Sequence, residues 1–127
     1  MKHFFALLFV CCLFLLTACN KDVGIQSRDY PFVITNEASV FAEGVTLSAN
    51  IMNTGPDEIL EYGFVWSIHK NPTSSNLSVL FSEAGGKGIY TSTQTTGLVS
   101  SQTYFVRAYL KTSKYEVYGN EIMFTAL

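Results

Sequence analysis

The sequence predicts an all-β protein, an antiparallel β-sandwich of about seven short strands, because three observations agree over residues 32–127. Apolar and polar residues alternate with a period of two, as in strands with one buried face. Clusters rich in Gly, Pro and Asn interrupt the alternation at short intervals. No window has the 3.6-residue period of an amphipathic helix. Many short strands separated by frequent turns are typical of two packed antiparallel sheets.

The alternation is clearest over residues 45–51, where apolar side chains at every odd position alternate with Thr46, Ser48 and Asn50. Residues 102–111 repeat it, and their expected buried face is Tyr104, Val106, Ala108 and Leu110. In chain order, the expected strands cover residues 32–35 with 40–41 just after, 45–51, 62–67, 79–81, 89–95, 102–111 and 115–125.

The last of these strands allows two phases. Tyr118, Ile122 and Phe124 share a buried face only if Asn120 also points inward. Alternatively, Val117 is inside and a bulge at Gly119 changes the face afterwards. Because aromatic side chains weigh heavily in cores, the first phase is favoured.

Residues 1–18 predict a cleaved secretory signal. A basic start precedes an apolar run of 13 residues, shorter than the ~20 that a membrane-spanning helix needs. The run ends in Leu16-Thr17-Ala18-Cys19, which resembles the lipobox of bacterial lipoproteins. That resemblance implies that the Cys19 Sγ receives a diacylglyceryl group and that Cys19 becomes the mature N-terminus. An ordinary signal peptide with an unrelated cysteine is the alternative.

Removal of residues 1–18 leaves 109 of the 127 residues, which suffices for one domain. Of the eight Lys and Arg residues only Lys2 leaves, so seven basic and ten acidic side chains give a net charge of −3. Such a chain lacks the basic surface that nucleic-acid binding requires. Cys11 and Cys12 leave as well, so the domain has no thiol. We expect no cofactor and no metal.

Residues 19–31 are expected to be the lipidated N-terminus and a polar tether, and residues 32–127 the folded domain. A flexible tether of about 12 residues has an end-to-end distance of roughly 20 Å, which keeps the domain near the membrane. Polar residues after the lipidated cysteine loosely resemble the export signals of surface lipoproteins in Bacteroidota, although those signals are usually more acidic. Which face of the membrane carries the protein therefore stays open.

Several motifs follow one another in an order that is typical of a known family. They are Gly63-Phe64-Val65-Trp66-Ser67, Asn71-Pro72, Gly97-Leu98, Tyr104-Phe105-Val106-Arg107-Ala108-Tyr109, and Tyr118-Gly119-Asn120-Glu121 with Phe124-Thr125. Over residues 32–126 they resemble the fibronectin type III-like domains of Bacteroidota envelope proteins. The resemblance implies an immunoglobulin-like or fibronectin type III-like sandwich. It also implies that Leu98 and Tyr104 form a tyrosine corner, in which the Tyr hydroxyl bonds to the preceding loop.

Few residues after the signal could carry catalysis. His69 is the single histidine there, and we expect it to be solvated in a loop. Without a second histidine or a cysteine, Cys–His catalysis and the common zinc ligand sets are excluded. No Gly-x-Ser-x-Gly motif supports a serine hydrolase. The acidic group of Asp57, Glu58 and Glu61 fits no Ca²⁺ loop, and residues 85–88 lack the pattern of a phosphate-binding loop.

Aromatic residues offer a candidate ligand-binding surface. Phe105, Arg107 and Tyr109 alternate away from the expected buried face of their strand, and Tyr62 and Trp66 could lie beside them on the neighbouring strand. We call these five residues the aromatic stripe. If exposed, the stripe could stack on sugar rings or contact a protein partner, with Arg107 over a ring. Ordinary cross-strand packing is the alternative.

These observations together favour a lipid-anchored, non-enzymatic interaction module at the outer membrane. Its expected partners are the membrane and an unidentified protein or glycan. A carbohydrate-binding lipoprotein that uses Tyr62, Trp66 and Tyr109 is the alternative, and a hydrolase is a second one.

Overall fold

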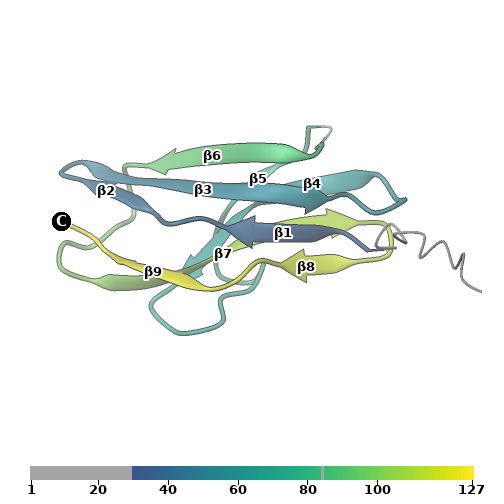
Figure 1. Cartoon of the computed structure of the whole chain (residues 1–127). Helices are drawn as coiled ribbons and strands as arrows, with labels where there is room; N and C mark the ends of the chain where they lie inside the picture. Colours follow the sequence, from purple (N-terminus) through teal and green to yellow (C-terminus); the bar gives the residue numbers. More distant parts are fainter. Residues whose placement is uncertain (1–29, 84) are drawn as a thin grey trace, which may run out of the picture.

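Alternating apolar residues form nine strands in two antiparallel sheets, as the computed structural model of residues 30–83 and 85–127 shows (Figure 1). The strands are β1 (Phe32–Thr35), β2 (Ser39–Phe41), β3 (Gly44–Asn53), β4 (Ile59–Ser67), β5 (Leu77–Phe81), β6 (Gly88–Gln94), β7 (Thr103–Thr112), β8 (Glu116–Tyr118) and β9 (Ile122–Thr125). In the first sheet, β1 and β2 pair with one side of β3 and β6 with the other. In the second sheet, β4 lies between β5 and β7, and β8 and β9 both pair with the free side of β7.

The predicted antiparallel β-sandwich is therefore confirmed, with nine strands where about seven were expected. All seven expected segments form strands. The count differs because the first and the last segment are each divided in two, at residues 36–38 and at residues 119–121. Both halves of each pair lie along the same side of one neighbouring strand, so the sandwich still has seven strand positions.

The core lies between the two sheets. The expected inward face of β7 is buried, because Tyr104 is 3% exposed and Val106, Ala108 and Leu110 are fully buried. The odd-numbered residues 45–51 of β3 meet them from the other sheet, and each is at most 2% exposed. Full burial of a Val, Leu or Ile side chain stabilises a fold by about 1.5–3 kcal/mol, so these two strands provide much of the driving force.

The favoured phase of the last strand is wrong, and the bulge alternative is correct. Val117 packs against the core, whereas Tyr118 lies on the outer face opposite Tyr109. Between that pair and the Val106–Ile122 pair, three residues of the last strand stand opposite two of β7. One extra residue is the definition of a β-bulge, and it moves the following residues to the other face.

The bulge joins the two sheets at one edge, and we call its contacts with β1 the bulge junction. The Thr35 Oγ1 accepts a hydrogen bond from the buried Ala108 N–H at 2.9 Å. The Asn120 side chain binds both backbone groups of Thr35, since its Oδ1 accepts from Thr35 N at 2.9 Å and its Nδ2 donates to Thr35 O at 3.0 Å. A Cβ on Gly119 would lie 2.5 Å from the Thr35 Oγ1, so only glycine fits there.

Tyr90 joins the sheets on the opposite side of the sandwich. It projects from β6 into the core, and its hydroxyl donates to the Gly63 carbonyl of β4 at 2.9 Å. Its ring lies 5.1 Å from the ring of Tyr62 and 5.0 Å from that of Phe64. Desolvation by burial raises the pKa of the Tyr90 phenol, so this hydroxyl remains a donor.

The last two residues of the expected tether contact the sandwich. Pro31 is buried, and the Tyr30 carbonyl accepts a hydrogen bond from the Asn53 Nδ2 at 3.1 Å. Gly55 has a φ of 68°, which favours glycine, and a Cβ at this position would lie close to Pro31. The connection between β3 and β4 therefore fixes where the chain enters the domain.

Replacing the Asn120 side chain should weaken the fold. The Asn120→Ala change leaves the N–H and C=O of Thr35 without their partners, so we expect the free energy of unfolding to fall by about 1–3 kcal/mol in a urea titration. Asn76→Ala is the matched control, because among the described residues the Asn76 side chain bonds only within its own exposed turn. Equal losses in the two variants would contradict the role of the bulge junction.

Candidate interaction surface on the second sheet

Two members of the aromatic stripe point into the core instead of outward. In the β4–β7 register, Trp66 lies opposite Val106 and Tyr62 opposite Leu110. Cross-strand partners project from the same face of a sheet, and the β7 partners face the core. Trp66 is accordingly 6% exposed, and the half-buried Tyr62 packs against the core with its ring 5.1 Å from that of Tyr90.

The other three members share the outer face of β7, but they form no exposed aromatic surface. Tyr109 is 1% exposed, and its ring lies 5.4 Å from that of Tyr118. Desolvation by burial raises the pKa of the Tyr109 phenol. Because Trp66 and Tyr109 are both buried, the stripe does not form the exposed aromatic surface on which a sugar ring would stack.

A loop fastened to β8 covers part of this outer face. It connects β4 with β5, spans residues 68–76 and contains the fully buried Pro72. The Ser74 N–H donates to the Tyr118 hydroxyl at 3.0 Å, and the Ser74 Oγ donates to the Glu116 Oε1 at 2.9 Å. The Tyr118 hydroxyl in turn donates to the same carboxylate oxygen at 2.5 Å. Hydrogen bonds from Tyr118 and Ser74 hold the pKa of Glu116 below its ordinary value.

Arg107 and the bulge complete this layer. The Arg107 guanidinium lies 4.5 Å from the centroid of the Tyr118 ring, so the expected cation–π contact exists. Its Nε donates to the Gly119 carbonyl at 3.3 Å. The Glu121 carboxylate accepts a hydrogen bond from the backbone N–H of Asn71 in the loop. The contacts with Tyr118 and Gly119 hold the Arg107 side chain against the sheet and leave it little freedom to recognise a ligand.

Beside this layer, a hollow of about 390 Å³ remains open. Its lining residues are Lys70, Phe105, Glu121, Ile122 and Met123, and we call it the Met123 hollow. Met123 is 69% exposed and Phe105 is half-buried. Apolar side chains thus share this hollow with a cation and an anion, which suits a protein partner that inserts one apolar side chain among polar neighbours. Of these residues, the sequence had singled out only Phe105 as a candidate.

The expected tyrosine corner has the predicted contact. The Tyr104 hydroxyl accepts a hydrogen bond from the Val99 backbone N–H at 2.9 Å, five residues upstream. Leu98 packs against the core, and the Tyr104 ring stacks on that of Phe124 at 5.4 Å. The corner therefore ties the connection between β6 and β7 to the second sheet.

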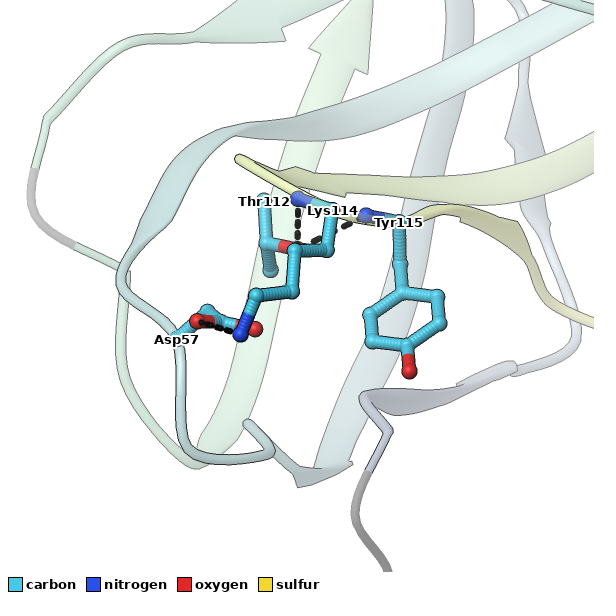
Figure 2. Close-up of polar contacts among 4 residues, drawn as sticks. All are labelled: Asp57, Thr112, Lys114 and Tyr115. Carbon is cyan, nitrogen blue, oxygen red and sulfur yellow. Dashed lines mark hydrogen bonds and ion pairs between the residues drawn. The ribbon is translucent and has the colours of Figure 1, made fainter.

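Of the acidic group, Asp57 and Glu58 lie in the β3–β4 connection and Glu61 lies in β4. Asp57 forms an ion pair with Lys114 at 3.0 Å and thereby joins the β3–β4 connection to the β7–β8 hairpin (Figure 2). In that hairpin the Thr112 Oγ1 accepts hydrogen bonds from the backbone N–H groups of Lys114 and Tyr115, at 3.3 and 3.0 Å. Among residues 30–83 and 85–127, no three His, Cys, Asp or Glu side chains are placed to hold a metal ion.

The remaining candidates lie apart from one another. His69 is exposed, its backbone N–H donates to the Ser67 Oγ at 3.0 Å, and its imidazole forms no ion pair with any described residue. Residues 85–87 lie in the β5–β6 connection, Gly88 is the first residue of β6, and Gly85 lies against Ile59 and Tyr62. Neither feature meets the other groups that a hydrolase or a phosphate site would need.

The lipobox residues Leu16, Thr17, Ala18 and Cys19 lie outside the described residues. Within the described part of the chain, no helix is both long and apolar enough to cross a membrane. Comparison with family models, curated proteins and solved structures finds no match for this chain.

Loss of one hydroxyl tests the tyrosine corner. Tyr104→Phe removes the acceptor for the Val99 N–H, so we expect thermal or urea unfolding to show a stability loss of about 0.5–1.5 kcal/mol. Tyr115→Phe is the control, since that ring is 40% exposed and its hydroxyl makes no hydrogen bond to a described residue. An unchanged midpoint in Tyr104→Phe would count against the corner.

Proposed function

We propose that this protein is a lipid-anchored component of a bacterial cell envelope, held at the outer membrane through Cys19, and that it serves as a non-enzymatic interaction module. The observation that carries the anchor is the sequence Leu16-Thr17-Ala18-Cys19 directly after an apolar run of 13 residues. A run of that length is too short to span a bilayer, and the small residues before the cysteine give a signal peptidase access.

The sandwich supports the second half of this proposal. Its two sheets and the Tyr104–Val99 contact agree with a fibronectin type III-like domain, and we propose that relationship. A fold of this kind hosts many roles, so the role has to come from a surface. The Met123 hollow supplies one, because its lining combines the exposed apolar atoms of Met123 with Lys70 and Glu121.

A protein partner fits this hollow better than a glycan does. Sugar rings are bound by stacking on flat, exposed aromatic faces, and the two best candidates for that, Trp66 and Tyr109, are buried. A methionine adapts its shape to a partner side chain, and the flanking charges can orient a peptide by electrostatic complementarity. We therefore propose a protein ligand that inserts an apolar side chain at Met123.

The anchor is tested by removing one sulfur. We expect Cys19→Ala to abolish lipid attachment, seen as loss of the acyl mass from the N-terminal peptide, and to move the protein from the membrane to the soluble fraction. Cys12→Ala is the matched control, because Cys12 leaves with the signal and its loss should change neither readout. Membrane retention of the Cys19→Ala protein would contradict the anchor.

The binding surface is tested separately from the anchor. A photo-crosslinking residue at Met123 should capture one defined envelope protein in the native host, whereas the same residue at the exposed Thr95 should not. Lys70→Glu should reduce that capture at least about tenfold, since it reverses one of the two flanking charges. Equal capture at Met123 and Thr95, or no effect of Lys70→Glu, would contradict the proposed surface.

A further inference from the structure

The edges of the two sheets differ in how they are protected against pairing with another strand. The β1–β2 edge is interrupted at residues 36–38, and Thr35 at the end of β1 is bound by Asn120. The β8–β9 edge is interrupted by the bulge at residues 119–121, and β5 is only five residues long. Bulges, interruptions and short lengths are the devices by which natural sheets prevent edge-to-edge association.

β6 carries none of these devices. It runs unbroken for seven residues, pairs with β3 on one side, and on its other side pairs with no described strand; it is the uppermost strand in Figure 1. It contains neither a proline nor a charged residue. From Leu77 to Gln94 the only charged residues are Glu83 and Lys87, and both lie in the β5–β6 connection. A free edge of this kind presents backbone N–H and C=O groups to an incoming strand.

The side chains beside the free edge leave room for such a strand. On the outer face of β6, Thr91 and Thr93 are exposed and Ile89 is 70% exposed. Thr93 reaches back to the Thr46 hydroxyl of β3 at 3.0 Å, away from the free edge. On the inner face, Tyr90 is directed into the core. The outer row is uncharged and β-branched, which is a composition that pairs well across strands.

We propose that β6 pairs in antiparallel fashion with β6 of a second copy of this chain, with the two-fold axis at Thr91, the middle residue of the strand. This register places Ile89 of each copy opposite Thr93 of the other, and their methyl groups meet. No like charges face each other, so self-pairing carries no electrostatic cost. An isologous pair of this type closes on itself, and it makes the first sheets of both copies continuous.

The pairing is compatible with membrane anchors at both N-termini but does not depend on them. Val33 of β1 and Gly88 of β6 both pair with Ile51, so the N-terminal end of the domain lies near the start of β6. Antiparallel pairing therefore places the two N-terminal ends at opposite ends of strands that are about 24 Å long. Ten residues lie between Cys19 and Tyr30, and the eleven steps from one Cα to the next can span at most about 40 Å, which lets both anchors reach one membrane when the strands lie along it.

An engineered thiol tests the register directly. In an antiparallel pair, residues at the two-fold axis have Cα atoms about 4.5–5.5 Å apart, which is within the range that a disulfide bridges. The full chain carrying Thr91→Cys, purified in detergent, should form a disulfide-linked dimer under mild oxidation. The unmodified chain controls for Cys11, Cys12 and Cys19, and Thr125→Cys places a thiol on the exposed face of β9 instead. No dimer with Thr91→Cys, or the same yield with Thr125→Cys, overturns the proposal.

Charge exchange at the same position provides a second test that needs no oxidation. Thr91 is exposed, so Thr91→Lys and Thr91→Glu should fold normally, which circular dichroism checks. In sedimentation velocity each variant alone should dimerise at least about tenfold more weakly than the unmodified chain, because like charges meet at the axis. An equimolar mixture of the two should restore dimers. A chain that stays monomeric without substitution, or a Thr91→Lys chain that associates equally well, overturns the proposal.

Discussion

The hydrogen bond from the Ala108 N–H to the Thr35 Oγ1 marks the constraint on which the rest of the structure depends. At the bulge of residues 119–121, neither β8 nor β9 provides a backbone acceptor for this N–H of β7, and an unpaired buried N–H costs about 1–3 kcal/mol. Thr35 supplies the partner from the other sheet, and Asn120 replaces a strand by binding both backbone groups of Thr35. The bulge that interrupts the edge of the second sheet therefore also provides the hydrogen bonds that connect the two sheets.

The same break determines what the outer face of the second sheet can do. Because the bulge reverses the phase, Tyr118 turns outward and meets Arg107, Tyr109 and the loop of residues 68–76. That layer buries Tyr109 and removes the flat aromatic surface that a glycan would need. The Met123 hollow lies where the layer ends, between the loop and β9. We propose that this hollow is the protein-binding surface of a lipid-anchored envelope module.

Short sequence patterns predicted those parts of the fold that depend on residues close together in the sequence. The alternation of apolar and polar residues predicted which faces of β3 and β7 are buried, because each strand has one face in the core and the other toward solvent or a polar layer. It could not orient Tyr62 and Trp66, since residues 62–66 are apolar on both faces and Val65 is buried under the outer layer as completely as Phe64 is in the core. The phase of the last strand depended on Thr35, 85 residues away from Asn120. The Met123 hollow combines a loop with two strands, which no single segment reveals.

Native-state hydrogen exchange at the Ala108 amide tests the central claim most directly. If Thr35 completes the bulge junction, this N–H exchanges in the unmodified protein only when the whole domain unfolds. In Thr35→Val, which keeps the shape of the side chain and removes the acceptor, the same amide should exchange through a local opening at lower free energy. Core amides of β3 should then still report global unfolding. An Ala108 amide that exchanges as fast as those of exposed loops, or at the same free energy of opening in both proteins, would contradict the account.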